Sequence, residues 1–240
     1  MKWYRGPDGG QRLWFETGEI ETVCEEELKR AGLMPTEAAP VTDLERLIEQ
    51  HLKATLDQYA DLEQDVLGLT TFLAHKAPAV SLNKDLTGSA LDEEDAEPGL
   101  KGRWRATLAH EASHIILHRF LFDVDLHQGQ LFAEPSEQRH PVAMRCLKRD
   151  AGYRSRTSDW REVQANQGMA GLLMPQKLFR KAAKTLGAAI GVSVPTASSA
   201  PGLLLAHRLA ETFAVSRQAA VIRLETLALI VPQGTVTLAL

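Results

Sequence analysis

The clearest pattern of hydrophobic and polar positions lies in residues 104–120 and has the period of an α-helix. On a helical wheel, apolar or small residues such as Trp104, Leu108 and Ile115 occupy most of the circumference. The polar side chains gather in the remaining sector, called here the polar strip: Arg103, Thr107, His110, Glu111, His114 and His118. The pattern predicts a largely enclosed helix with its reactive groups on one face.

A second helical pattern covers residues 160–174 and ends at Pro175, which does not continue a helix. Short β-like runs predict three strands, at residues 54–59, 67–73 and 79–82. Weaker signals predict the other elements: a hairpin in 2–16, helices in 19–35, 42–51, 203–213 and 216–229, and a terminal strand in 234–240.

These elements predict an α+β fold, in which a small β-sheet packs on the helix of residues 104–120 and the C-terminal half is mostly helical. We expect three regions: a hairpin and helix extension in 1–40, a core in 41–180, and a helix-turn-helix-like segment with a terminal strand in 181–240. A loop insertion is expected at 121–159, where the chain shows little periodicity. Within the core, Thr42 is expected to cap the helix that follows it.

Composition narrows the class of protein. The chain has 240 residues with 44% hydrophobic and 24% charged content, which is enough for a substantial core. It contains no apolar run that would cross a bilayer and begins without a secretory signal, so a cytoplasmic protein with no membrane association is expected. A net charge of −4 gives no overall attraction to nucleic acid. With only Cys24 and Cys146, a four-cysteine zinc module is excluded.

His110, Glu111 and His114 have the spacing H-E-x-x-H. The two histidines project from one helix face, roughly 6 Å apart along the axis, so both can bind one Zn²⁺ ion. Glu111 points about 100° away and can reach a water molecule at the ion as a general base. The competing interpretation is a half-buried helix whose histidines merely face solvent. The gathering of ionisable groups in the polar strip of an otherwise apolar helix favours the metal site.

A catalytic zinc site takes a third protein ligand. The candidates are His127, His140, Cys146, Asp150, Asp159 and Glu162. Glu162 shares its helix face with Ala165 and other core-type residues, whereas Gln164 lies on another face, so the Glu162 carboxylate points towards the core and needs a cation. Cys146 is the main rival, but a thiolate ligand would leave Glu162 unexplained. Asn166, one turn later, can hydrogen-bond the second nitrogen of a ligand histidine.

Three segments, in this order, resemble the ImmA/IrrE family of zinc metallopeptidases: RATLAHEASHIILH, WREVQANQGMAGLLMP and LAETFAVSRQAAVIRL. The resemblance is strong over about residues 100–230, weaker over about 42–85, and does not extend to 1–40. It implies a zincin-like core of the gluzincin type. At residues 167–169, QGM stands where the family usually has an aromatic residue before Ala, so the packing of this helix is expected to differ.

The resemblance implies that His110, His114 and Glu162 bind Zn²⁺, that Glu111 is the catalytic base, and that Asn166 orients a ligand histidine. It also implies an endopeptidase with a protein substrate, since the family cleaves helix-turn-helix transcriptional repressors in mobile-element control and in stress responses that include DNA damage. Many relatives carry an N-terminal DNA-binding domain, which the hairpin and helix predicted here do not resemble. A repressor target is therefore expected to be a separate chain.

Further site candidates lie outside the motif. A second donor to the substrate oxyanion is expected, and His140, Tyr153 and His207 are candidates for it. His118 lies roughly 12 Å along the axis from His110, too far to share the ion, and is assigned to the cleft or to the helix end.

The alternative function is a non-catalytic, metal-binding regulatory or DNA-binding protein. It would use the C-terminal helices as a helix-turn-helix, with Ser216 as an N-cap and with Arg217 and Arg223 facing outward. The helix of residues 216–229 is mostly apolar and carries only these two arginines, which favours core packing. Direct nucleic-acid binding through these helices is therefore the secondary expectation.

Overall fold

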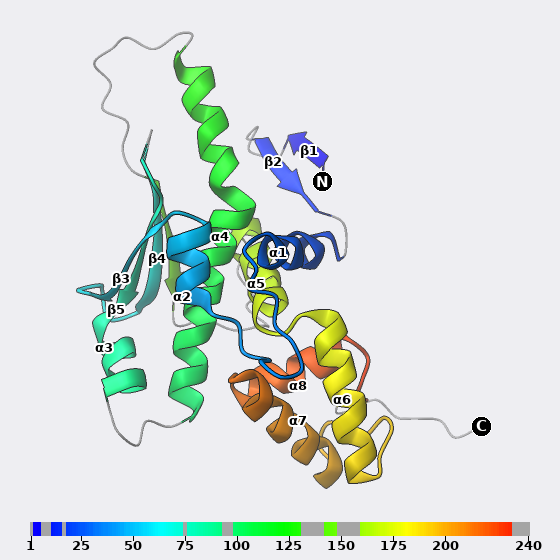
Figure 1. Ribbon diagram of the computed structural model, residues 1–240. Coiled ribbons are helices and arrows are strands. Elements are labelled where there is room, and N and C mark those ends of the chain that lie inside the picture. Colours follow the sequence, from blue (N-terminus) through cyan, green and yellow to red (C-terminus); the bar gives the residue numbers. More distant parts are fainter. Residues whose placement is uncertain are drawn as a thin grey trace.

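The computed structural model describes residues 2–5, 11–15, 18–73, 76–92, 98–130, 142–147 and 159–231. Within these ranges the fold is α+β, as predicted, and the second half is mostly helical. In Figure 1 the long helix α4 (Pro98–Gln130) stands between the sheet on one side and helices α1 (Glu19–Arg30) and α5 (Trp160–Leu173) on the other. This position explains why apolar residues surround most of α4.

The four-stranded sheet has the order β3-β5-β4-β6. Its predicted strands are confirmed, within one residue at each end, as β3 (Thr55–Ala60), β4 (Val66–Phe72) and β5 (Ala79–Asn83). β3 and β5 run parallel, whereas β4 is antiparallel to both β5 and β6. The fourth strand, β6 (Val142–Leu147), is absent from the prediction.

The loop predicted at 121–159 needs two corrections. First, α4 continues through Gln130, because residues 121–130 contain no proline that would interrupt the helical hydrogen bonds. Second, β6 occupies part of the same stretch and pairs with β4 in a ladder that ends with Phe72 opposite Val142. Strand β6 is held in place by pairing with β4, which is distant in sequence, and local periodicity does not reveal such a partner. Residues 131–141 and 148–158 lie outside the described ranges.

The helix predicted at 42–51 also begins differently. It consists of α2 (Leu44–Arg46) followed by a π-helical turn, η1 (Leu47–His51). The N-cap is Asp43, whose side chain accepts a hydrogen bond from a backbone N–H of α2, and not Thr42. The Thr42 hydroxyl instead donates to the carbonyl of Leu172 at 2.7 Å and so ties this segment to α5.

The C-terminal helices lie together beyond the end of α5 (Figure 1). α7 (Ala200–Phe213) and α8 (Arg217–Thr226) confirm the two predicted helices, and α6 (Gln176–Ile190) is an additional one. The Ser216 hydroxyl caps α8, as predicted, by accepting a hydrogen bond from the N–H of Ala219.

Arg223 corrects the outward orientation expected for it. Its side chain is only 1% exposed. The guanidinium donates to both carboxylate oxygens of Glu21 on α1, at 2.7 and 2.8 Å, and to the carbonyl of Met174 at the end of α5. A bidentate pair of this kind is strong and directional, so it holds α8 against α1 and α5. This arginine is therefore not presented to nucleic acid.

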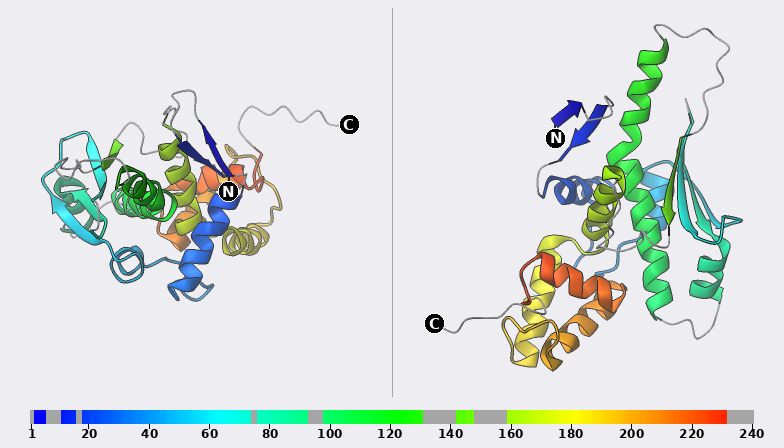
Figure 2. Two further views of the ribbon diagram at one scale, coloured as in Figure 1. Left: turned by 90° about the horizontal axis from the view of Figure 1, so that it is seen from above. Right: turned by 180° about the vertical axis from the view of Figure 1, so that it is seen from behind.

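The remaining elements lie at the periphery. The predicted N-terminal hairpin is confirmed as β1 (Lys2–Arg5) and β2 (Gln11–Trp14), which pair antiparallel on the side of α4 away from the sheet (Figure 2). α3 (Lys84–Thr87) and the π-helical turn η2 (Gly88–Asp92) follow β5. The strand predicted at 234–240 falls outside the described residues. Among the described helices, none has the length and apolar character to span a membrane.

Candidate metal centre

His110 and His114 lie one turn apart on α4 and face Glu162 in the first turn of α5. The Nε2 atoms of the two histidines are 3.0 Å apart. Glu162 places Oε2 3.1 Å from His110 Nε2 and Oε1 3.3 Å from His114 Nε2. All three side chains are buried. The structure thus brings the three predicted ligands together in one cluster, with their ligand atoms within 4.8 Å of one another.

The start of α5 and its close contact with α4 position Glu162. The Asp159 side chain caps the helix by accepting a hydrogen bond from the N–H of Arg161 at 3.0 Å. Further along, a Cβ atom at Gly168 would lie 2.7 Å from the hydroxyl of Ser113 on α4, so only glycine permits this approach. The glycine of the QGM segment is therefore a packing contact between the two helices.

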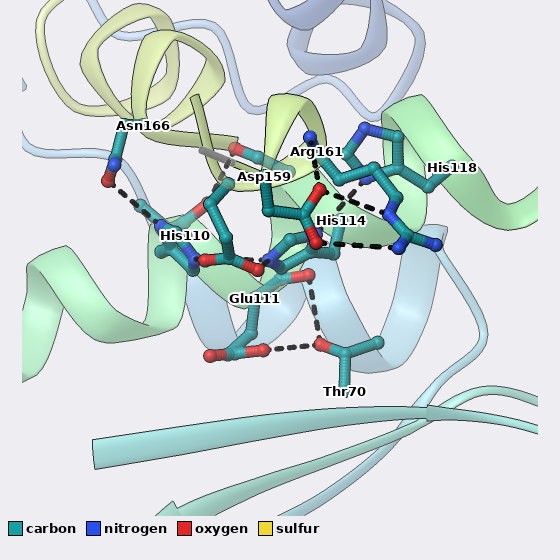
Figure 3. Close-up of polar contacts among 11 residues, drawn as sticks. Thr70, His110, Glu111, His114, His118, Asp159, Arg161 and Asn166 are labelled. Atoms are coloured by element: carbon teal, nitrogen blue, oxygen red, sulfur yellow. Dashed lines mark hydrogen bonds and ion pairs between the residues drawn. The ribbon is translucent and has the colours of Figure 1, made fainter. Parts of the chain in front are cut away.

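Hydrogen bonds behind the two histidines determine which ring nitrogens carry protons (Figure 3). His110 Nδ1 donates to Asn166 Oδ1 at 3.1 Å, the contact expected of this asparagine. His118 Nε2 donates to Gln164 Oε1 at 3.1 Å, which leaves its Nδ1 free to accept from His114 Nδ1, also at 3.1 Å. In His110 and His114 the proton is thus on Nδ1, and Nε2 presents a lone pair.

Two lone pairs and a carboxylate therefore face one another in a buried space. All three groups accept hydrogen bonds in these states and none donates, so the cluster needs a cation. Without metal, a proton supplies that charge: burial lowers the pKa of His110, but Glu162 and Glu111 outweigh this and the net shift is upward. Two imidazoles and one carboxylate are a ligand set that suits Zn²⁺, with a fourth position for water or substrate. The residues present fit a catalytic metal ion.

Glu111 reaches from α4 towards β4 (Figure 3). The Thr70 hydroxyl donates to its Oε2 at 2.6 Å, whereas Oε1 has no hydrogen-bond partner in the described part of the chain. β4 makes room for the carboxylate at Gly68, where a Cβ atom would lie 2.5 Å from Oε1. A buried carboxylate oxygen without a hydrogen-bond partner can accept a proton from substrate or water, as a general base must.

The pKa values of Glu111 and Glu162 are shifted in opposite directions. Burial raises the pKa of Glu111 to about 7, although His110 and the Thr70 hydrogen bond partly offset the effect. In the metal-free site burial also disfavours the charge on Glu162, but the facing histidines, which donate to the carboxylate only when Nε2 is protonated, outweigh it and hold its pKa well below the usual range. A charged ligand beside a carboxyl that titrates near neutral pH is the division of roles expected of a metal ligand and a base.

The other predicted candidates do not join this cluster in the same way. Cys146 on β6 stays close, with its Sγ within 4.8 Å of ligand atoms of His110 and Glu111. Asp159 is occupied in capping α5, and His207 lies on α7 with its side chain half exposed in an ion pair. Four candidates fall outside the residues whose side chains are described: His127, His140, Asp150 and Tyr153.

The support behind His114 differs from the sequence prediction. The helical pattern places His118 at the cleft or the helix end, but this side chain of α4 is buried, and Trp160 packs edge-on against it with ring centroids 5.7 Å apart. It places Gln164 on another face, but this side chain is buried and accepts from His118. The available signal was the four-residue spacing from His114 to His118. The contact of Thr70 with Glu111 had no signal in the sequence.

A helix with the H-E-x-x-H spacing, a glutamate from the following helix and a sheet behind the base are features of zincin-like metallopeptidases. Residues 101–225, more than half of the chain, match the family described as the IrrE N-terminal-like domain, Peptidase M78. The chain therefore belongs to this family, and the resemblance seen in its motifs is confirmed. None of the curated proteins compared with the chain matches it.

The substitution Glu111→Gln should stabilise the metal-free protein at and above neutral pH. Folding raises this pKa from 4.5 to about 7, so the folded state binds the extra proton, and stability is lost as pH rises through that window. Glutamine stays neutral and avoids this cost, which is of order 3 kcal/mol above the window. Urea unfolding of chelator-treated protein across pH should show a gain that is small near the lower value and largest above the upper one. A gain that does not vary with pH would contradict this assignment.

The substitution His118→Phe should weaken Zn²⁺ binding by about 10- to 100-fold, because it leaves the Nδ1–H of His114 without an acceptor. His118→Gln offers an amide oxygen and should recover part of the affinity. His207→Phe, which changes an exposed histidine, is the control and should bind Zn²⁺ like the wild type. Competition with a chromophoric chelator measures all four proteins. Equal affinities for His118→Phe and wild type would show that His118 does not position His114.

Proposed function

We propose that this protein is a zinc-dependent endopeptidase that cleaves a specific protein substrate. The observation that carries the proposal is the pair of Nε2 lone pairs on His110 and His114 that converge on Glu162, with the unpartnered oxygen of Glu111 buried beside them. Membership of a peptidase family supports the reaction class.

The chemistry divides between the ion and the base. A Zn²⁺ ion held by His110, His114 and Glu162 would polarise the substrate carbonyl and acidify a water molecule. Glu111, whose Oε1 has no hydrogen-bond partner in the described part of the chain, takes the proton of the attacking water and then delivers it to the departing amine. Thr70 holds one carboxylate oxygen by its hydroxyl, so the other stays directed away from it and available for the proton.

β6 offers a place for the substrate backbone. It is the last strand in the described sheet, and it lies beside β4, which carries the contacts to Glu111. Cys146 on this strand approaches both Glu111 and His110. An edge strand pairs readily with an extended peptide, because its outer N–H and C=O groups are available. The substrate would then be cut within an extended segment rather than at a chain end.

We further propose that the substrate is a helix-turn-helix transcriptional repressor on a separate chain, cleaved in the cytoplasm during a stress response or in mobile-element control. Support comes from the resemblance to the ImmA/IrrE motifs and from membership of the matching family. The alternative of a DNA-binding protein loses one of its two candidate arginines, since Arg223 is buried against Glu21.

Metal content and cleavage of a proteome-derived peptide library test the enzymatic proposal together. Purified wild-type protein should hold about one Zn²⁺ and produce new peptide termini. His114→Ala should lose both properties, because it removes a ligand. Glu111→Gln should keep the metal but cleave at least about 100-fold more slowly, because it removes the general base. A metal-loaded wild type that cleaves no peptide would contradict the proposal, as would a Glu111→Gln variant with full activity.

A further inference from the structure

A cavity of about 300 Å³ opens beside the metal centre. His110 and Asn166 line it, together with Cys146 of β6. The Cys146 Sγ in turn lies within 4.8 Å of ligand atoms of both His110 and Glu111. The cavity therefore reaches a residue that would hold the ion, and one of its lining residues, Cys146, lies close to the catalytic base.

The walls of this cavity come from distant parts of the chain. α4 contributes Leu100 and Ala106, in the turns that precede His110. α8 contributes Ala219 and Ile222, which lie about one turn apart. These side chains are all aliphatic. The interior thus offers apolar contact surface.

The rim is polar and open to solvent. Arg103 of α4 and Gln218 of α8 both line the cavity, and both are exposed. The cavity thus combines exposed polar residues, aliphatic walls and the ligand His110. A preformed apolar pocket with a few polar groups at its end is the usual form of a ligand site.

The two walls are fixed relative to each other. A Cβ atom at Gly102 on α4 would lie 2.6 Å from the backbone nitrogen of Ser216, so glycine allows α4 to touch the start of α8. From within α8, Arg223 is tied to Glu21 and to the carbonyl of Met174. Direct contacts within the chain therefore hold the helices that bound the pocket.

We infer that this cavity binds a large apolar side chain of the substrate, from a residue next to the cleaved peptide bond, and that α8 determines this specificity. The identity of the occupant rests on the proposed peptidase function. Leucine, methionine and aromatic side chains suit the volume and the aliphatic walls, whereas a charged side chain would lose hydration where it lies against those walls. Helix α8, which the alternative function assigns to DNA binding, would instead contact the protein substrate.

Binding of N-acetylated amino-acid hydroxamates tests the pocket without any turnover. The hydroxamate group occupies the metal position, and the side chain is varied through glycine, alanine, leucine and phenylalanine. Titration calorimetry of the zinc-loaded protein should show the leucine and phenylalanine compounds binding at least about tenfold more tightly than the glycine compound. Equal affinities across the series in the wild type would overturn the inference.

Two variants that fill the cavity and one control variant test whether the cavity causes the preference for larger side chains. Ala106→Leu fills the pocket from α4 and Ile222→Trp fills it from α8; either should abolish the preference for the larger side chains while the glycine compound still binds. Arg217→Trp places the same bulky residue on α8 at an exposed position outside the pocket and should keep the preference. Folded, zinc-loaded filling variants that retain the wild-type preference would overturn the inference.

Sequencing of the peptide-library products separates this inference from the proposed function. Wild-type cleavage sites should be enriched in large apolar residues at one position beside the cut, and Ala106→Leu should shift that position to smaller residues. Side-chain-dependent hydroxamate binding without any cleavage would support the pocket and reject the peptidase. Cleavage with no such enrichment would support the peptidase and reject the pocket.

Discussion

The structure depends on an electrostatic constraint: two imidazole lone pairs and a carboxylate meet in a buried space, and only a cation makes the arrangement favourable. His110 and His114 supply the lone pairs because Asn166 and His118 hold their Nδ1 protons on the opposite side of each ring. Glu162 supplies the carboxylate. The contact between α4 and α5 is thus both part of the protein core and one half of the metal centre.

The surrounding packing serves this meeting of helices. Gly168 lets α5 approach α4, and Gly68 lets Glu111 lie against β4. On the far side, Gly102 lets the start of α8 touch α4, so the C-terminal helices complete a pocket rather than stand as a separate module. Each glycine marks a close approach for which a methyl group would leave no room. The site is therefore built by close approach of backbones as much as by its charged residues.

The sequence predicts those parts of the site that follow from helical geometry. His110, Glu111 and His114 share a helix face by their spacing, and Glu162 is a charge on a core-facing stripe that requires a partner. The sequence does not predict contacts that depend on tertiary neighbours. The contact of Gln164 with His118 depends on how α5 packs against α4, which a helical wheel does not show. Strand β6 is likewise ordered by its pairing with β4. A helical wheel shows which residues share a face of a helix, but it does not show which elements cover that face.

Anomalous X-ray scattering at the zinc absorption edge, from crystals of the zinc-loaded protein, would locate the ion and identify its ligand atoms. We expect one strong peak bonded to the Nε2 atoms of His110 and His114 and to the Glu162 carboxylate, with Glu111 close by but not bonded to the ion. A peak bonded to the Cys146 sulfur in place of Glu162 would contradict it, and so would a peak on the Nδ1 atom of either histidine.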